Sequence, residues 1–350
     1  MQSFAGNFSY VSVYDSSFFQ FGDLLAITLK DSEGESEYIL RLQHSSIYED
    51  GKVFAKKQNL ICETTVLGER EIGEVANGIE PKTHLQFDGT IAVIASSGAE
   101  NYYHWVYQIL PRIKILQESK LTFNKLYFYN LSKSYQHEML NMLNISYDDV
   151  LVGKPGEMIM AEQILVPSIP VWPIKGKMLS SWVVDFLHDS FINQNNESEF
   201  PSKIFISRKF AKLRHIINED KVTELLQLYG YTIVFLEKLS VSDQITMFSK
   251  ANVVMGVHGS GLTNFVFCKP GTHVIEFDPY DGHRGPFQGI ARSMNLEYRS
   301  IETKKGAMTQ EELNRDSIFV DIEDLESVLD DIDSIRIPSD VSGEILHNEL

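Results

Sequence analysis

The chain has few of the features that mark specialised protein classes, and each absence narrows its function. Only Cys62 and Cys268 occur in 350 residues, far apart in sequence, so neither a disulfide framework nor a paired-thiol metal site is expected. No run reaches the roughly 18 uninterrupted apolar residues that a membrane span needs. The opening residues, Met1 to Tyr10, have neither the basic nor the apolar segment of a secretion signal. We therefore expect a folded, cytoplasmic protein.

Positive charge is also scarce. The formal net charge is -17, which argues against a nucleic-acid binder, because such proteins need clustered Lys and Arg to displace counterions from phosphates. Most of the excess lies in residues 311–350, where thirteen acidic residues accompany only Arg315 and Arg336. The remaining chain is mildly acidic, so a local basic pocket for a phosphate is compatible with its charge.

A pair of carboxylates at a strand end, which would hold a divalent ion on a diphosphate, is not evident. Asp331 and Asp333 form an Asp-x-Asp pair, but it lies in the acidic tail. Asp278 and Asp281 fall in a loop that contains a proline. We therefore expect no essential metal and no other cofactor.

Length and composition fit two soluble domains, since 43% of the residues are hydrophobic and 23% are charged. The first 95 residues alternate short β-like runs with turn signals. An amphipathic helix is expected around Trp105 to Leu116, with a kink or break at Pro111. A β-α-β rhythm follows, and a helix over 177–191 leads into the polar stretch Asn193 to Pro201. We predict a domain boundary there.

Beyond this boundary the chain alternates strands and helices, which predicts a doubly wound parallel sheet. The expected strands are 203–207, 232–235, 252–256 and 273–277, and the expected helices are 219–228, 242–250, one opening at Gly259 to Leu262, and 318–332. The last helix is amphipathic and is expected to pack back across the domains. The domains are then 1–195, an acceptor-side α/β domain with a strand-rich opening; 200–310, a Rossmann-like domain; and 311–350, an acidic tail.

The strongest candidate site follows the apolar strand 252–256. His258-Gly259-Ser260-Gly261 is a small, glycine-bearing loop before a helix start, where free N–H groups favour an anion such as a diphosphate. The alternative is a tight β-α turn with a structural histidine. Glu276, near the end of the next strand, is suited to accept hydrogen bonds from ribose hydroxyls, or else to form an ion pair there.

Two further segments carry candidate residues. Arg208 and Arg214 follow a strand and precede Asn218 at a helix start, so they are placed to clamp a diphosphate, unless the loop is merely solvated. In the first domain, His104 stands in an aromatic cluster, and an imidazole accepts a proton from a hydroxyl at neutral pH. The alternative for His104 is a buried capping histidine.

Together these segments resemble glycosyltransferase family 61, the DUF563-type group. It includes plant xylan xylosyl- and arabinosyltransferases, animal GlcNAc-transferases of the secretory route and bacterial capsular polysaccharide or lipopolysaccharide enzymes. The segments that carry the resemblance are Asn101-Tyr102-Tyr103-His104-Trp105, Leu110-Pro111-Arg112, Ile206-Ser207-Arg208 with Arg214 and Asn218-Glu219, His258-Gly259-Ser260-Gly261-Leu262-Thr263-Asn264, Gly271-Thr272, and Val274-Ile275-Glu276-Phe277. Ordered motifs over about 175 residues are more specific than any one of them.

The resemblance implies a GT-B fold, with two Rossmann-like domains facing across a cleft. It also implies inversion at the anomeric carbon and a nucleotide-sugar donor, usually uridine-linked, held by the C-terminal domain without an essential metal. By the same resemblance the donor is lined by His258, Ser260, Leu262 and Asn264, its diphosphate faces Arg208 and Arg214, and its ribose faces Glu276, with His104 across the cleft. The catalytic base is not fixed, and Glu100 and Asp281 are alternatives to His104.

The resulting hypothesis is a hexosyl- or pentosyltransferase of polysaccharide biosynthesis. Its partners would be a nucleotide-sugar donor and a glycan or glycolipid acceptor, reached through a peripheral membrane partner at the inner face of a membrane where the acceptor is a lipid. The Gly259-Ser260-Gly261 amides would help to neutralise the leaving diphosphate, and domain closure about Asn193 to Pro201 would accompany donor binding. The alternatives are a non-catalytic nucleotide-sugar-binding or scaffold protein, and a nucleotide-sugar hydrolase or epimerase.

Overall fold

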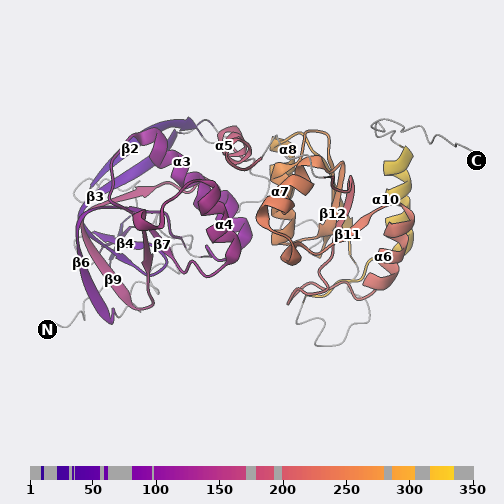
Figure 1. Cartoon of the computed structure of the whole chain (residues 1–350), viewed down its shortest axis with the longest axis horizontal. Helices are drawn as coiled ribbons and strands as arrows, with labels where there is room; N and C mark the ends of the chain where they lie inside the picture. The colour runs from indigo at the N-terminus through magenta and orange to yellow at the C-terminus, as the bar shows by residue number, and fades with distance from the viewer. Residues whose placement is uncertain are drawn as a thin grey trace, which may run out of the picture.

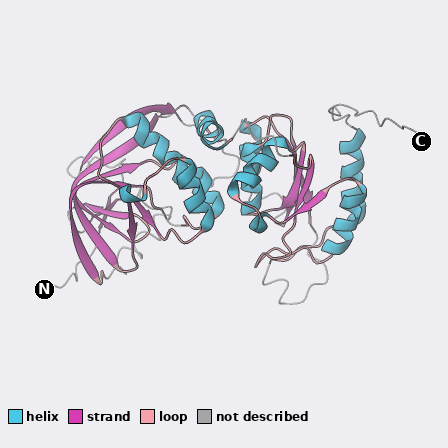
Figure 2. Ribbon diagram, viewed as in Figure 1, coloured by secondary structure: helices cyan, strands magenta, loops and turns pink. Residues whose placement is uncertain are grey.

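The structure is a computed structural model of the chain. It describes residues 9–11, 22–30, 34, 36–55, 59–61, 81–96, 98–170, 179–192, 199–279, 286–303 and 316–334. Within these residues the chain forms two β-sheets that lie one after the other along the long axis of the molecule, each with its own helices (Figures 1 and 2). The protein is therefore α/β, as the sequence predicts.

The first sheet is mixed. Its nine described strands follow the order β1-β5-β4-β3-β9-β6-β7-β8, with β2 paired to β3. Their bounds are Ser9–Val11 (β1), Gly22–Lys30 (β2), Ser36–Tyr48 (β3), Lys52–Ala55 (β4), Asn59–Ile61 (β5), Thr83–Val93 (β6), Lys125–Tyr129 (β7), Val150–Gly153 (β8) and Glu157–Pro167 (β9). β9, β6, β7 and β8 are parallel neighbours, whereas β3 runs antiparallel to β2, β4 and β9. This half is thus less Rossmann-like than expected, because antiparallel strands from the opening residues extend the parallel part.

Helices cover one face of this sheet. They are α2 (Tyr102–His104), the π-helix η3 (Trp105–Ile109), α3 (Leu110–Ser119), α4 (Ser134–Met142) and α5 (Ser181–Phe191), with the 3-10 turn η4 at Tyr147–Asp149. Pro111 stands in the first turn of α3, directly after the π-helix. The predicted break is confirmed, since proline suits a first helical turn, where its missing N–H costs no hydrogen bond.

The second sheet is entirely parallel, in the order β11-β10-β12-β13-β14. Its strands are Lys203–Ile206 (β10), Thr232–Val234 (β11), Val253–Val257 (β12), His273–Asp278 (β13) and Glu297–Glu302 (β14). Its helices are α6 (Glu219–Leu228), the short 3-10 turn η5 (Leu236–Lys238), α7 (Val241–Lys250), the 3-10 helix η6 (Ser260–Phe267), α8 (Phe287–Ser293) and α10 (Ile322–Ser334). α7, η6 and α8 pack on one face, and α6 and α10 on the other. The predicted doubly wound sheet is confirmed.

The two halves share a hydrophobic core. One continuous cluster joins Tyr107 and Phe186 of the first half to Phe248 and Phe265 of the second. The Tyr107 hydroxyl donates to the Thr263 carbonyl at 2.9 Å, and a ring nitrogen of His188 donates to the Val266 carbonyl at 2.6 Å. Any closure of the halves on a ligand is therefore constrained by a packed, hydrogen-bonded interface. The expected hinge at Asn193 to Pro201 lies largely outside the described residues.

The C-terminal helix differs from its prediction. It begins at Ile322 rather than Ile318, because Ile318 forms a β-bridge with Ile216 and is buried by that pairing. Its apolar side packs against α6 and the outer face of the second sheet instead of crossing between the halves. No helix within the described ranges is both long and apolar enough to span a membrane.

Candidate functional site

The site lies where the order of the second sheet reverses. From β10 the chain first adds β11 on one side and then crosses to add β12 on the other. The carboxyl ends of two such neighbouring strands leave a crevice in which doubly wound sheets bind ligands. Ser207 and Arg208 follow β10, and His258 and Gly259 follow β12, so two of the predicted motifs meet at this point.

Two arginines converge on Gly259. The Arg208 guanidinium donates to the Leu213 carbonyl at 2.9 and 3.2 Å, which closes its loop, and Arg214 donates to the His258 carbonyl at 2.7 Å. A Cβ placed on Gly259 would lie 2.6 Å from Nη1 of Arg208 and 3.6 Å from Nη1 of Arg214. Glycine at this position thus admits both guanidinium groups beside the backbone. The diphosphate clamp stays a prediction from the sequence, and both of its arginines lie beside Gly259.

Arg214 is held in an unusual backbone conformation, with a φ of 60° in the left-handed region. Its Nε is buried and has no hydrogen-bond partner among the described residues. Because a buried, unpaired donor on a charged group is costly, an anionic ligand at this position would stabilise it.

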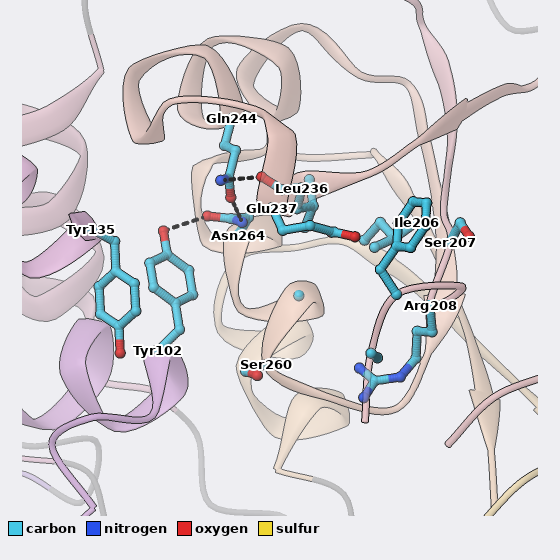
Figure 3. A pocket seen from close by; sticks show the side chains of 13 residues that line it. Tyr102, Tyr135, Ile206, Ser207, Arg208, Leu236, Glu237, Gln244, Ser260 and Asn264 are labelled. Atoms are coloured by element: carbon cyan, nitrogen blue, oxygen red, sulfur yellow. Dashed lines mark hydrogen bonds between the residues drawn. The ribbon is translucent and has the colours of Figure 1, made fainter. Parts of the chain in front are cut away.

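A pocket of about 320 Å³ opens between the two halves beside these arginines. It is lined by Tyr102, Tyr135, Ile206, Ser207, Arg208, Phe210, Ala211, Leu236, Glu237, Gln244, Ser260, Gly261 and Asn264 (Figure 3). Ile206, Leu236 and Phe210 supply apolar surface, and Phe210 is 57% exposed. We name this space the larger pocket. Its mixture of apolar and polar groups is typical of a small-molecule site.

Asn264 forms one wall of the larger pocket. It accepts a hydrogen bond from the Tyr102 hydroxyl at 2.7 Å and donates to Oε1 of Gln244 at 2.9 Å (Figure 3). Its side chain is completely buried. Asn264 therefore joins the two halves across the pocket, and its polar atoms are engaged in this bridge rather than presented to a donor.

A second space of about 190 Å³, the smaller pocket, lies on the other side of Ser260. Its lining is Asn101, Tyr103, His104, Arg214, His258, Gly259, Ser260, Pro286 and Phe287. Ser260 borders both pockets, so a ligand that passes Gly259 and Ser260 reaches from one to the other. His104 and His258, from different halves of the chain, face this one space.

His104 is partly exposed, and its Nδ1 pairs with Oε1 of Gln108 at 2.8 Å. Gln108 is completely buried, so it fixes the orientation of the ring. Nearby, the Tyr103 hydroxyl is buried without a hydrogen-bond partner among the described residues. Burial raises the pKa of Tyr103, which keeps this hydroxyl protonated as a donor toward a ligand at neutral pH.

Glu276 is placed differently from its predicted role. Its side chain is 1% exposed, and its two oxygens contact Nδ1 of His258 and the hydroxyl of Tyr298. Burial, and next the charge of Glu276, raises the pKa of Tyr298, so this hydroxyl remains a donor to the carboxylate. The expected contact of Glu276 with a ribose has no geometric support, because both oxygens are already engaged beneath the pocket wall.

Two more of the predicted donor-binding residues, Asn218 and Leu262, make contacts within the protein instead of lining a pocket. Asn218 donates to the Val320 carbonyl at 2.7 Å and accepts from the Val320 amide at 3.1 Å, which ties the segment before α10 to the start of α6. Leu262 is 1% exposed and packs against Gly256 in the core. Neither residue lines the larger or the smaller pocket, because each points into protein rather than into the crevice.

Glu100 and Asp281 are the alternatives to His104 as the catalytic base. Glu100 is exposed, and its carbonyl accepts from the Tyr135 hydroxyl at 2.6 Å, but it lines neither pocket. Asp281 lies outside the described residues. Of the two candidates within the described residues, His104 lines the smaller pocket and Glu100 does not.

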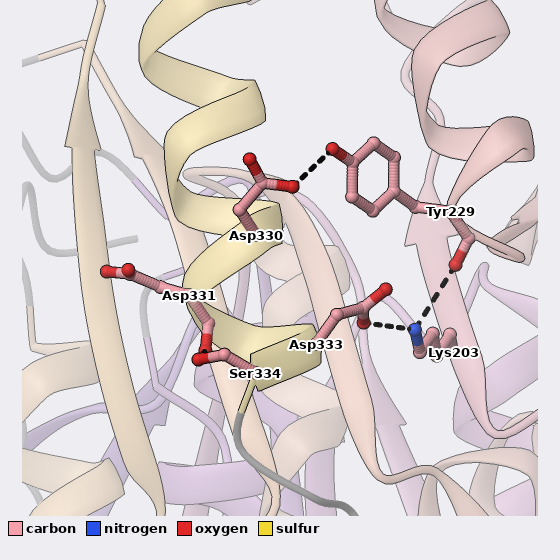
Figure 4. Close-up of polar contacts among 6 residues, drawn as sticks. All are labelled: Lys203, Tyr229, Asp330, Asp331, Asp333 and Ser334. Carbon is pink, nitrogen blue, oxygen red and sulfur yellow. Dashed lines mark hydrogen bonds and ion pairs between the residues drawn. The ribbon is translucent and has the colours of Figure 1, made fainter.

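The Asp-x-Asp pair of the acidic tail is remote from the pockets. Asp333 pairs with Nζ of Lys203 at 2.6 Å, and Asp330 accepts from the Tyr229 hydroxyl at 2.6 Å (Figure 4). Asp331 pairs with Arg299 at 3.2 Å. These contacts fasten α10 to the second sheet. Across the described ranges, no group of three or more His, Cys, Asp or Glu side chains is arranged to hold a metal ion.

The sequence interpretation missed three residues that shape the site. Phe287, on α8, lies 5.3 Å from the His258 ring and 5.8 Å from the Tyr103 ring, between centroids. Gln244 holds Asn264, and Tyr298 holds Glu276. No local sequence pattern could have identified these three residues, because each contacts a site residue that is distant in the chain.

The fold and the site define an α/β protein with a cationic crevice at the switch point of a doubly wound sheet, and comparison with known proteins makes this specific. A model of the family Glycosyltransferase 61 matches residues 102–275, the segment that contains both arginines, both histidines and most of the pocket lining. The chain belongs to this family.

Curated relatives agree with this assignment. Alpha-1,3-arabinosyltransferases XAT2 and XAT3 of Oryza sativa subsp. japonica are 31% and 30% identical over 121 and 129 residues. These segments are 32% and 34% of this chain but 20% and 22% of the relatives. A Beta-1,2-xylosyltransferase of Arabidopsis thaliana is 30% identical over 99 residues, 25% of this chain and 18% of that protein. The matched segment therefore spans about a fifth of the relatives' length.

Proposed function

We propose that this protein is an inverting, metal-independent glycosyltransferase that moves a hexose or a pentose from a UDP-linked donor to a hydroxyl of a glycan or glycolipid. The observation that carries the proposal is the convergence of Arg208 and Arg214 on Gly259 and Ser260, between two pockets at the switch point of the second sheet. The family supports it, because its relatives are named as arabinosyl- and xylosyltransferases.

In this proposal, the two arginines hold the diphosphate of the donor. A diphosphate beside Ser260 would receive two guanidinium groups, which present their donors in a planar fork that matches phosphate oxygens. The charge that develops on the leaving diphosphate would be met by these fixed cations, which is the role that a divalent ion has in metal-dependent transfer. Metal independence follows as a proposal from this supply of positive charge.

In the proposal, the two pockets bind different parts of the substrates. The larger pocket, with Ile206, Leu236 and Phe210, has the apolar surface to receive a nucleoside. The smaller pocket, with His104 and His258, would receive the sugar and the acceptor hydroxyl. Both pockets meet at Ser260, where the diphosphate would join the nucleoside to the sugar. A GT-B arrangement, with the two halves facing across this crevice, fits the same division.

The proposed step is a single displacement. His104 takes the proton from the acceptor hydroxyl, the acceptor oxygen attacks the anomeric carbon, and the bond from that carbon to the diphosphate oxygen breaks. The electron pair leaves with the nucleoside diphosphate, held by Arg208 and Arg214. An α-linked donor would therefore give a β-linkage. We place the reaction in the cytoplasm, on soluble glycans or on glycolipid heads at the inner face of a membrane.

A donor screen tests the proposal. UDP-xylose, UDP-arabinose, UDP-GlcNAc, UDP-glucose and GDP-mannose are offered to the wild type, to Arg208→Ala and to Lys212→Ala, with EDTA present, and binding is followed by calorimetry. Lys212 is an exposed cation of the same loop and serves as the matched control. We expect one UDP donor to bind, with a loss of about 10- to 100-fold in affinity in Arg208→Ala alone.

Product analysis with the same donors completes the test. Transfer to an added glycan that is indifferent to EDTA supports the proposal. Release of free sugar without any acceptor would instead indicate a hydrolase, and binding without turnover would indicate a nucleotide-sugar-binding protein. A wild type that binds none of the nucleotides would overturn the proposed function altogether.

A further inference from the structure

Two tyrosines of the first half form hydrogen bonds to the same helix of the second half. The Tyr102 hydroxyl donates to Oδ1 of Asn264 at 2.7 Å, and the Tyr107 hydroxyl donates to the Thr263 carbonyl at 2.9 Å. Thr263 and Asn264 are neighbours on η6, and both are completely buried. We call these two bonds the tyrosine tethers. His104 lies in the chain between the two tyrosines, so the segment that carries it is fastened to η6 on both sides.

The acceptor of the first tether is held in one orientation. Nε2 of Gln244 donates to the Leu236 and Leu239 carbonyls at 2.9 and 3.2 Å. This leaves Oε1 of Gln244 to accept from Nδ2 of Asn264 at 2.9 Å (Figure 3). The Asn264 amide therefore presents its oxygen to Tyr102. Burial raises the pKa of Tyr102, so its hydroxyl keeps the proton that this bond needs.

The tethered segment departs from α-helical geometry. η3 is a π-helix, and the N–H that follows it donates to the carbonyl five residues back. A π-turn is wider than an α-turn, so it brings residues five apart, such as Tyr102 and Tyr107, closer to the same side of the helix. The π-helix also carries Gln108, whose Oε1 lies 2.8 Å from Nδ1 of His104. The same short stretch of chain therefore carries one tether and orients the imidazole ring.

The other ends of the tethers lie close to the proposed diphosphate position. η6 begins at Ser260, which borders both pockets, and Gly259, beside which both arginines lie, directly precedes it. η6 is one helix of eight residues, so its first turn and Asn264 belong to the same rigid element. The tethers thus set the separation between α2, which carries His104, and the loop at which the diphosphate would leave.

We propose that Tyr102 and Tyr107 are positioning residues that hold His104 at the distance from the diphosphate position that sugar transfer requires. The inference rests on the proposed function and adds two residues to it. His104 takes the acceptor proton while the bond from the anomeric carbon to the diphosphate breaks, so base, acceptor oxygen and leaving group must be aligned at the same moment. Both tyrosine hydroxyls are engaged with η6. They act on the reaction through His104.

Turnover and binding together separate this role from donor binding. Tyr102→Phe and Tyr107→Phe each remove one hydroxyl. kcat is measured with the UDP-sugar and the glycan that the wild type uses in the donor screen, and UDP affinity is measured by calorimetry. We expect kcat to fall about tenfold in each variant, because a displaced base loses rate, while UDP affinity stays within about twofold of the wild type.

A matched control removes a tyrosine hydroxyl elsewhere in the first half. The Tyr127 hydroxyl donates to the Glu49 carbonyl at 2.6 Å, and Tyr127 lines neither pocket. Tyr127→Phe should therefore leave kcat and UDP affinity unchanged. Thermal unfolding of all three variants checks that each is folded at the temperature of the assay.

A double variant tests whether Tyr102 acts through the base. His104→Gln should lower kcat about 100-fold or more, since general-base assistance is lost. When Tyr102→Phe is added to His104→Gln, kcat should fall by less than about twofold further, because no base remains to be positioned. A purely structural effect of Tyr102→Phe would lower kcat by the same factor with and without His104.

Four results would overturn the inference and leave a glycosyltransferase. They are an unchanged kcat in both tyrosine variants, an equal effect of Tyr102→Phe with and without His104, a fall in UDP affinity that matches the fall in kcat, and full activity of His104→Gln. A wild type that transfers no sugar from any of the donors would overturn the proposed function, and the inference with it.

Discussion

Two sites in the molecule hold arginines from the family motifs, and they use the same side chain for different purposes. Arg112, in the first half, is 1% exposed and donates to the carbonyls of Ile94 and Ala95, which follow β6, and of Pro167, which ends β9. Arg208 and Arg214, in the second half, are partly exposed and bond one carbonyl each at the rim of the pockets. Thus one arginine ties strand ends together, and the other two line the pockets.

The difference teaches that residue type and motif do not separate structural from functional cations. Burial lowers the pKa of Arg112 to about 9, and the guanidinium still carries its charge at neutral pH, where the carbonyl dipoles compensate it. Around Arg214, by contrast, the buried Nε is unmatched within the described part of the chain. A fully satisfied cation stabilises the fold, whereas an unsatisfied one at a pocket is available for binding.

The largest effect is expected for Arg112. Arg112→Met should reduce the free energy of unfolding by about 3–5 kcal/mol, because the buried carbonyls of Ile94, Ala95 and Pro167 lose a charged donor. Chemical denaturation measures it. Arg41→Met, which removes a partly exposed arginine paired with Asp23 at 2.7 Å, is the control and should lower the free energy of unfolding by at most about 1 kcal/mol. Equal costs for the two variants would refute the structural role of Arg112.

Arg214→Ala should have a small effect on stability and a large effect on binding. The free energy of unfolding should fall by about 1 kcal/mol, because one hydrogen bond to the His258 carbonyl is lost. UDP affinity should fall about 10- to 100-fold. Denaturation and calorimetry on the same preparation give both numbers. Lys212→Ala is the matched control. An equal loss in the free energy of unfolding for Arg214→Ala and Arg112→Met would contradict the distinction between a structural and a binding arginine.

A smaller effect is expected at the glycine between the arginines. A Cβ on Gly259 meets Nη1 of Arg208, the far end of a flexible side chain, so Gly259→Ala should displace the guanidinium at little cost in stability. UDP affinity should drop by about tenfold, as for one lost charged hydrogen bond. Gly261→Ala is the comparison, since its Cβ meets Leu236 and Ile206 instead, at 3.2 and 3.3 Å. A larger loss of affinity in Gly261→Ala would argue against the arginine clamp.

The smallest effect concerns a histidine at the start of β13, at the end of the strand away from the pockets. Burial lowers the pKa of His273, at the start of β13, below its ordinary 6.5, and Arg299 adds to the shift while Glu297 opposes it. The unfolded chain therefore binds the proton more readily. Stability should be full above pH 6.5 and decline as the pH falls through and below that value. His273→Gln should flatten this decline in denaturation measured at pH 7.5 and 5.5, and parallel curves would exclude His273 as its source.

Much of the second half was predictable because its signals are local. α6 was predicted at 219–228 and lies at Glu219–Leu228, and the parallel strands β10, β12 and β13 agree with their predicted positions within one residue. Apolar runs alternating with amphipathic helices have one common arrangement, a parallel sheet covered on both faces. Since parallel strands end at one edge, Arg208, Arg214 and His258 were expected together, and the structure brings them together.

The first half and the roles of single residues were less predictable. The antiparallel strands β3 and β9 pair over a separation of more than one hundred residues, which no local pattern specifies. Asn218 and Leu262 were predicted at the donor, but their side chains are satisfied within the protein. Glu276 was expected at a ribose and proved to be the buried partner of His258. Each of these outcomes depends on contacts between residues distant in the chain.

The sequence by itself determined the family, the parallel sheet of the second half and the loops at which a ligand site forms, because motifs and periodicity are local properties of the chain. Only the tertiary structure decided which polar side chains are satisfied internally and which face the pockets. Burial and pairing are set by neighbours from other strands and from the other half of the molecule. The contact between His258 and Glu276, the role of Arg112 in holding strand ends together, and the bridge from Tyr102 to Asn264 all follow from such neighbours.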